Sequence, residues 1–264
     1  ASEWLQYLSV GGQNAILSFD NVSNLFNIVK IDGAVLELDQ LYELGKFCKS
    51  VILAKNLLSI ENKKSLEKDG VFVNELPNLN SIAHKLPNLQ ESLNIIFKII
   101  DEDGQLRDLP QLRLIRQSIQ RIRKEIEALI KSYTSNPHLK DILQSDVPVL
   151  RGERQVLAIK SNSKNRIPGI VHEMSQTGQT AYIEPEEVVK KNNDLIQEEF
   201  RLQQELRRIL KDVTRELKIF IEDFIFAHRL IIRLDCALAV AKWCKETNGV
   251  FAISKEDTEK IILK

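Results

Sequence analysis

Glycine, proline and cysteine are scarce in this chain of 264 residues, which contains 10, 7 and 3 of them. Residues that break helices are therefore few, whereas Leu, Ile, Lys and Glu are plentiful, so the composition favours helix. The odd number of cysteines, without closely spaced pairs, excludes a disulfide framework and is typical of a reducing cytoplasm. Aromatic residues make up 6% of the chain, so we expect a core of mainly aliphatic side chains.

Long hydrophobic runs are absent as well. No apolar stretch reaches the roughly 20 residues that cross a bilayer, and the first residues show no signal-peptide pattern. We therefore expect a cytoplasmic protein without a membrane partner. The hydrophobic fraction of 43% excludes general disorder, and the formal net charge of zero gives no overall attraction for a polyanion.

Motifs that bind nucleotides or metals are missing from the sequence. Gly45-Lys46 is followed by Phe47 and lacks the upstream glycine of a phosphate-binding loop. Neither a His-Glu-x-x-His motif nor paired cysteines at zinc-binding spacing occur. We therefore expect no enzyme activity, cofactor or metal in this chain itself.

Two acidic or histidine-containing segments have simpler interpretations than catalysis. His172-Glu173 matches half of a deaminase signature, but the cysteine half is missing, so we interpret the match as chance. Glu184, Glu186 and Glu187 surround Pro185, which suits the first position of a helix. Acidic residues in a first turn are favoured by the helix dipole, and this explains the cluster without a catalytic role.

Two segments read as long helices. The first runs from about Pro110 to Ser135, and Pro110 suits a first turn because its missing N–H costs nothing there. Its apolar positions alternate by four and three, the seam of a helix packed along a partner; they are Ile115, Ile119, Ile122, Ile126, Leu129 and Tyr133. The second segment has neither glycine nor proline from Glu186 to about Asn248, so it could be helical throughout.

The second segment continues a heptad seam over almost its whole length. One row is Val189, Ile196, Gln203, Leu210, Leu217, Phe224, Ile231 and Leu238, and the other is Leu206, Val213, Phe220, Ala227, Leu234 and Ala241. A seam this long needs a partner helix, and we expect the segment from Pro110 to Ser135 to run antiparallel to it. Cys236 and Cys244 lie eight residues apart on this helix, and we interpret both as small core residues on roughly one face.

Short strands are predicted between the two long helices. The candidates are Gln155–Ile159, Ile167–His172 and Thr180–Ile183. Thr177-Gly178-Gln179 reads as a hairpin turn that needs a positive φ at Gly178. The sequence thus predicts a mainly α fold, with a helical core, two long antiparallel helices and a small β element inserted at their tip.

The residues of this β element carry a family resemblance. The run Val156-Leu157-Ala158-Ile159-Lys160 is followed by Ile167-Pro168-Gly169-Ile170-Val171-His172-Glu173, Ser175, Thr177-Gly178-Gln179-Thr180, Ile183-Glu184-Pro185 and Asn192-Asn193. In order, spacing and residue type this block resembles the MutS family, and within it the bacterial paralogue branch that lacks the mismatch-reading N-terminal domain. One departure is Ala158, where family members often have proline.

The resemblance implies a division of the chain into a core, two lever helices and a clamp. It assigns residues 1–105 and 226–250 to the helical core, 106–147 to the ascending lever, 148–185 to the β-rich clamp, 186–225 to the descending lever, and 251–264 to the start of an ATPase domain. The ATPase domain itself, which would bind ATP and Mg²⁺ and dimerise, and a C-terminal nuclease-like domain are expected in a longer parent protein. That parent would be a DNA-stimulated ATPase acting in mismatch repair or in recombination control.

Cations concentrate where the resemblance places the clamp. Between residues 151 and 172 five cations accompany one acid, Glu153, although an ordinary solvated loop has the same composition. Our candidates for contacts with the phosphates of double-stranded or branched DNA are Arg151, Arg154, Lys160, Lys164 and Arg166, with Lys190 and Lys191 at the start of the following helix. Family knowledge offers an alternative, in which the arm grips ribosomal RNA or protein in the rescue of collided ribosomes.

Overall fold

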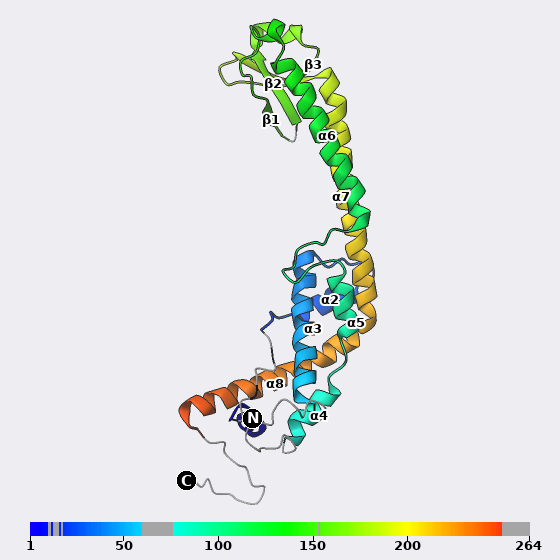
Figure 1. Cartoon of the computed structure of the whole chain (residues 1–264), viewed down its shortest axis with the longest axis vertical. Helices are drawn as coiled ribbons and strands as arrows, with labels where there is room; N and C mark the ends of the chain where they lie inside the picture. The colour runs from blue at the N-terminus through cyan, green and yellow to red at the C-terminus, as the bar shows by residue number, and fades with distance from the viewer. Residues whose placement is uncertain (10–11, 13–15, 17, 60–75, 153, 250–264) are drawn as a thin grey trace, which may run out of the picture. The chain divides into compact units, whose positions relative to one another are not determined.

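The computed structural model describes residues 1–9, 12, 16, 18–59, 76–152 and 154–249. The chain divides into two compact units, which are considered separately below. The first unit contains residues Ala1–Arg107 and Leu210–Lys264, and the second contains Asp108–Ile209. Glu153 and the expected ATPase start at 251–264 lie outside the described residues. The fold is mainly helical, as the sequence predicts, with one small antiparallel sheet (Figure 1).

The first unit is a helical bundle. Its helices are α1 (Ser2–Ser9), α2 (Ser23–Lys30), α3 (Leu38–Leu58), α4 (Pro77–Lys85), α5 (Gln90–Phe97), the last turns of α7 (Glu186–Leu217) and α8 (Ile221–Thr247). Helix α8 packs against α1 and α2, and α3 packs against α4 and α5. Rings of Phe26, Phe47 and Phe224 meet in its core, with centroids 5.9 to 6.4 Å apart. Thr214 ties α7 to this bundle, because its buried hydroxyl accepts the N–H of Leu36 at 2.9 Å.

The segment from Glu186 to Asn248, which could have been helical throughout, is not one continuous α-helix. Helix α7 ends at Leu217, and one turn of 3₁₀ helix, Lys218–Phe220, separates it from α8 (Figure 1). Neither glycine nor proline causes the break; β-branched and aromatic residues lower helix propensity here, and the buried ring of Phe224 follows immediately. Tertiary packing of the aromatic cluster therefore decides where the helix is interrupted.

The prediction for the two cysteines of α8 is also wrong for one of them. Cys244 is buried, but Cys236 is exposed. Eight residues advance an α-helix by about 80° beyond two full turns, so the two side chains cannot share one narrow buried stripe. Throughout the described part of the chain, no helix is both long and apolar enough to span a membrane.

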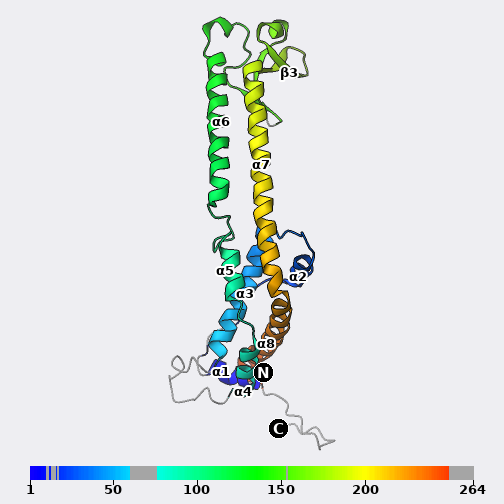
Figure 2. The same cartoon turned by 90° about the vertical axis from the view of Figure 1, so that its right-hand side faces the viewer.

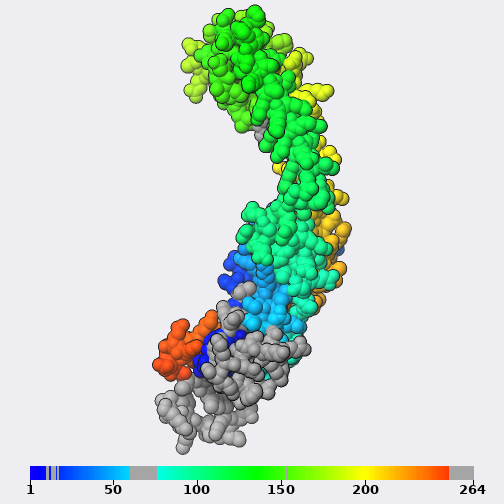
Figure 3. Space-filling view, in the orientation of Figure 1, coloured from blue at the N-terminus to red at the C-terminus, as the bar shows by residue number. Residues whose placement is uncertain are grey.

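The second unit is built on two antiparallel helices, α6 (Pro110–Thr134) and the first part of α7. They lie side by side in Figure 2, and the ion pairs Arg123–Glu199 and Glu125–Lys191, both 2.6 Å long, join them. Pro110 stands in the first turn of α6 as predicted. Four residues of the predicted seam of α6 are buried, Ile115, Ile119, Ile122 and Ile126, whereas the predicted Leu129 and Tyr133 are only partly buried and Ile130 is buried beside them. The opposite side of α6 faces solvent and the viewer in Figure 3.

The seam of α7 differs by one position from the predicted row in its first half. Val188 and Leu195 enter the hydrophobic core, whereas Gln203 of the predicted row is exposed. In the second half the predicted Leu210 and Leu217 are buried. A straight α-helix drifts by about 20° per heptad, so a strict seven-residue row extrapolated backwards leaves the buried face.

The sheet has four strands in the order β1-β2-β4-β3, and all its pairs are antiparallel. The strands are β1 (Val149–Arg151), β2 (Arg154–Lys160), β3 (Gly169–Met174) and β4 (Thr180–Pro185). Gly178 has a φ of 70°, as the predicted hairpin turn requires. The core that contains the α6 isoleucines also contains Leu157, Ile159, Ala181 and Ile183, so one face of the sheet packs on the helix pair.

Candidate functional site

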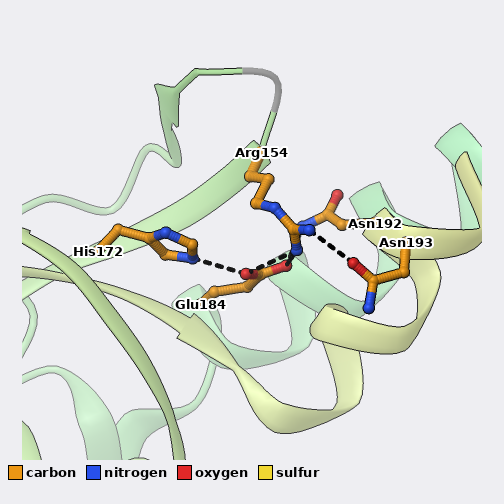
Figure 4. A network of polar contacts seen from close by, with 5 residues as sticks. All are labelled: Arg154, His172, Glu184, Asn192 and Asn193. Atoms are coloured by element: carbon orange, nitrogen blue, oxygen red, sulfur yellow. Dashed lines mark hydrogen bonds and ion pairs between the residues drawn. The ribbon is translucent and has the colours of Figure 1, made fainter. Parts of the chain in front are cut away.

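The carboxylate of Glu184, at the end of β4, is the centre of a polar cluster (Figure 4). Its side chain is 0% exposed. Arg154 Nη1 lies 2.8 Å from Oε1 and 3.1 Å from Oε2, and Asn192 Nδ2 donates to Oε1 at 2.8 Å. His172 Nε2 lies 2.6 Å from Oε2, and Arg154 Nη2 donates to Asn193 Oδ1 at 2.6 Å. Strands β2, β3 and β4 are thereby joined to the second turn of α7.

Local structure explains how these side chains converge. Val171 pairs with Ile183 and Glu173 pairs with Tyr182, so His172 is the extra residue of a β-bulge. A bulge re-aims a side chain, and this one brings His172 to Glu184. Alternation along β4 places Glu184 on the face opposite to Ile183, which belongs to the apolar core.

Hydrogen bonds keep the buried Glu184 ionised. Burial by itself raises the pKa of this carboxyl group, because it removes water from the charged form. Hydrogen bonds from Asn192, His172 and Arg154 outweigh burial and hold the pKa below its ordinary value. Removing one of these donors should destabilise the fold, because it leaves the buried charge of Glu184 incompletely paired.

A second, more exposed cluster stands on the same sheet. Arg151 Nε lies 2.8 Å from Glu173 Oε2, and the guanidinium lies 3.9 Å from the ring centroid of Tyr182. Arg151 and Arg154, both candidates for phosphate contacts, thus have carboxylate partners within the protein. Their charges are largely neutralised where they stand.

Three other candidates are exposed and carry no ion pair among the described residues: Lys160, Lys164 and Arg166. Lys160 ends β2, and the other two lie in the 3₁₀ segment Ser161–Arg166. The segment is anchored at both ends, because Ser161 N–H donates to the carbonyl of Gln179 at 2.9 Å and Ile167 is buried. These three residues are called the basic loop below.

The two lysines at the start of α7 differ in their surroundings. Lys191 pairs with Glu125 of α6 at 2.6 Å. Lys190 is exposed and lines a shallow hollow with Glu186 and Asp194, beside Ile170 of β3. Nearby acids make this hollow less favourable for a polyanion than the basic loop.

Sequence reasoning missed the Glu184 cluster. Glu186 and Glu187 do stand in the first turn of α7 as interpreted, but Glu184 belongs to β4 and is buried. His172, which belongs to the partial deaminase match, has a structural contact instead, since its ring lies against the Glu184 carboxylate. A signal was present, because Glu184, His172 and the Asn192-Asn193 pair all belong to the block that carries the family resemblance. The described residues contain no group of three or more His, Cys, Asp or Glu side chains that could hold a metal.

Comparison with known proteins gives a consistent set of relatives, although no protein-family model matches the chain. Endonuclease MutS2 of Thermotoga maritima is 30% identical over 251 residues, 94% of this chain and 31% of that protein. Endonuclease MutS2 of Halothermothrix orenii is 30% identical over 234 residues, 83% of this chain and 29% of that protein. For the protein of the same name from Solidesulfovibrio magneticus the identity is 28% over 237 residues, 88% and 29% of the two chains. The chain therefore spans somewhat under a third of these relatives. This similarity to proteins named endonuclease MutS2, over most of the chain, supports its placement in the MutS family.

Proposed function

We propose that the chain is the core, lever and clamp region of a MutS-like protein, and that its second unit binds nucleic acid through phosphates. In this proposal α6 and the first part of α7 are the lever helices, and the sheet with the basic loop is the clamp. The ligand is double-stranded or branched DNA, bound without sequence specificity. The similarity to MutS2 proteins supports a DNA-related function.

The availability of the basic loop carries the proposal. Lys160, Lys164 and Arg166 are exposed, close in sequence, and held on a segment with both ends anchored. Cations that have no competing carboxylate are the ones that gain most from a phosphate, because they release condensed counterions without losing an internal ion pair. Such contacts position a duplex and carry no base information.

The other candidates fit phosphate binding less well. Arg154 would have to leave the buried Glu184, and Arg151 would have to leave Glu173 and the Tyr182 ring. Lys191 is engaged by Glu125. The proposal therefore rests on the three residues of the basic loop, with Lys190 as a weaker contact.

Reversing the charges of the basic loop tests the proposal. The variant is Lys160→Glu with Lys164→Glu and Arg166→Glu, and the control reverses three exposed lysines elsewhere in the second unit, Lys124, Lys131 and Lys140. Both variants change net charge equally. Binding to a duplex of about 30 base pairs and to a four-way junction is measured by fluorescence anisotropy from about 20 to 300 mM salt.

We expect the basic-loop variant to lose affinity, and its slope of log affinity against log salt to become shallower by about 2 to 3, since each phosphate contact contributes about 0.9. The control should keep most of the wild-type slope. Equal behaviour of both variants, or no binding by the wild type at the lowest salt, contradicts the proposal. Pelleting with ribosomes forms a parallel arm: loss of pelleting without any DNA binding favours ribosomal RNA as the source of the phosphates.

The chain spans under a third of the length of its relatives. We infer that ATP and Mg²⁺ bind outside this chain, in an ATPase domain that dimerises, and that the parent lacks the mismatch-reading domain. The relatives' name, endonuclease MutS2, is consistent with an ATPase or endonuclease parent. The two binding arms above separate a role on DNA, in repair or recombination control, from a role in ribosome rescue.

A further inference from the structure

The Glu184 cluster connects the sheet to α7 through directional contacts. The single side chain of Arg154 contacts both elements, since Nη1 binds Glu184 of β4 and Nη2 binds Asn193 of α7. Figure 4 shows the carboxylate between the histidine on one side and the helix-borne asparagines on the other. Apolar packing on the opposite face of the sheet is non-directional, whereas hydrogen bonds weaken steeply when their angles change. The cluster is therefore the part of this junction that resists rotation.

We propose that Glu184 is a positioning residue, which fixes the sheet on α7 and thereby sets the direction in which the basic loop is presented. This inference rests on the proposed function. The side chain of Glu184 is fully buried, so it acts through Arg154 and through the strand that Arg154 begins.

The geometry of β2 explains why a small change at the cluster matters at the loop. Arg154 and Lys160 are the two ends of this strand. At about 3.3 Å per residue they lie roughly 20 Å apart, so a tilt of about 10° at Arg154 moves Lys160 by about 3.5 Å. A shift of this size breaks a hydrogen bond to a phosphate.

The test is Glu184→Gln, and Glu173→Gln is its matched control. Both changes neutralise a carboxylate that pairs with an arginine of the sheet. They differ in that Glu173 is 58% exposed and its partner Arg151 belongs to β1, whereas Arg154, the partner of Glu184, also bonds Asn193 of α7. Nitroxide labels at Asn162→Cys and Gln197→Cys, both exposed positions of the second unit, report the distance between loop and helix. The background carries Cys236→Ser, because Cys236 is exposed while Cys48 and Cys244 are buried.

We expect Glu184→Gln to shift or broaden the label–label distance distribution by about 3 Å or more, on the scale of the tilt above. DNA affinity should fall by about tenfold, equivalent to one charge-assisted contact, and the salt slope should become shallower by no more than about 1, the share of that one contact. Glu173→Gln should leave the distance distribution near wild type, and it should not lower DNA affinity, because it frees Arg151. Arg154→Lys, which keeps the charge but not the bridge to Asn193, should give an intermediate broadening, and it serves if Glu184→Gln does not fold.

Three results would overturn the inference. An unchanged distance distribution removes the positioning role, and so does a changed distribution with wild-type affinity. A shallower salt slope with an unchanged distance distribution would mean that the cluster itself supplies phosphate contacts. If the wild type binds no nucleic acid but Glu184→Gln still changes the distances, the proposed function fails while the positional role of Glu184 stands.

Discussion

Arg123 Nη2 of α6 lies 2.6 Å from Glu199 Oε1 of α7, although 76 residues separate them in the sequence. Together with the pair Glu125–Lys191, this pair fixes the relative direction of the two helices. In an antiparallel pair, residue numbers rise along one helix while the numbers of their partners fall along the other. From Arg123 to Glu125 the chain rises, and from Glu199 to Lys191 it falls.

A charge swap tests this register. The single changes Arg123→Glu and Glu199→Arg should each destabilise the second unit, and the double variant should recover most of the loss. Because both side chains are partly exposed, we expect a coupling energy of about 0.2 to 1 kcal/mol. Chemical denaturation of the four proteins of the cycle gives this value, and a coupling of zero at low salt would show that the pair does not form in solution.

The core of the helix pair predicts a large difference between two aliphatic residues of α6. Ile126 is buried, whereas Leu114 is 73% exposed. Ile126→Ala should lower the free energy of unfolding by about 2 to 5 kcal/mol, since it removes buried methyl groups and leaves a cavity. Leu114→Ala should change it by no more than about 0.5 kcal/mol, as for most surface positions. Similar losses for the two variants, measured by denaturation, would contradict the seam.

A close approach of two strands predicts that Gly169 tolerates no side chain. It pairs with Pro185, and a Cβ on Gly169 would lie 2.1 Å from the carbonyl oxygen of Glu184. Since that obstacle is backbone, Gly169→Ala should force the strands apart and cost about 1 to 3 kcal/mol or more.

Gly178→Ala is the control for this change. Nothing lies within 4 Å of a Cβ at Gly178, so only its positive φ opposes a side chain there. The expected cost is about 1 to 2 kcal/mol, the ordinary penalty for a left-handed residue. Thermal melts should therefore give a lower melting temperature for Gly169→Ala than for Gly178→Ala. The reverse order would mean that the two strands move apart at little cost.

Acid should weaken the second unit through Glu184. Its pKa in the folded state lies below the ordinary value of 4.5, so between the two values the unfolded state binds more protons. The stabilisation is therefore fully present above about pH 4.5 and is lost as the pH falls through the folded pKa.

Comparing wild type with Glu184→Gln isolates this contribution, because Asp32 and Glu125, whose pKa values are also lowered, titrate alike in both proteins. The stability advantage of the wild type should be largest near pH 7 and shrink as the pH falls below 4.5 through the folded pKa, since a protonated glutamate resembles glutamine. A constant difference across this range would show that Glu184 does not titrate with folding.

Local patterns were sufficient for much of the fold. The spacing of the isoleucines predicted α6 and its buried face, and Gly178 predicted the hairpin turn that the structure contains. Register was less accessible: the buried row of α7 begins at Val188 rather than Val189. A strict seven-residue repeat does not include the rotation of a straight α-helix by about 20° per heptad. The mismatch between the predicted and the buried row therefore grows with distance from the well-packed end of α7.

The candidate site was accessible only in part. Charge alone placed the three residues of the basic loop among the candidates, because a cation needs no partner to be recognised in a sequence. The roles of Arg151 and Arg154 could not be read in this way, since their carboxylate partners lie 22 and 30 residues further along the chain.

The sequence by itself determined the helices, the hairpin and the family resemblance, because these depend on periodicity and on local conformational preference. Only the tertiary structure decided which charges are neutralised and where the long helix is interrupted. Both depend on groups that the folded chain brings together from distant positions: a bulge aims His172 at Glu184, and a ring cluster holds Phe224. Burial and hydrogen-bond geometry then set which side chains remain available to a ligand.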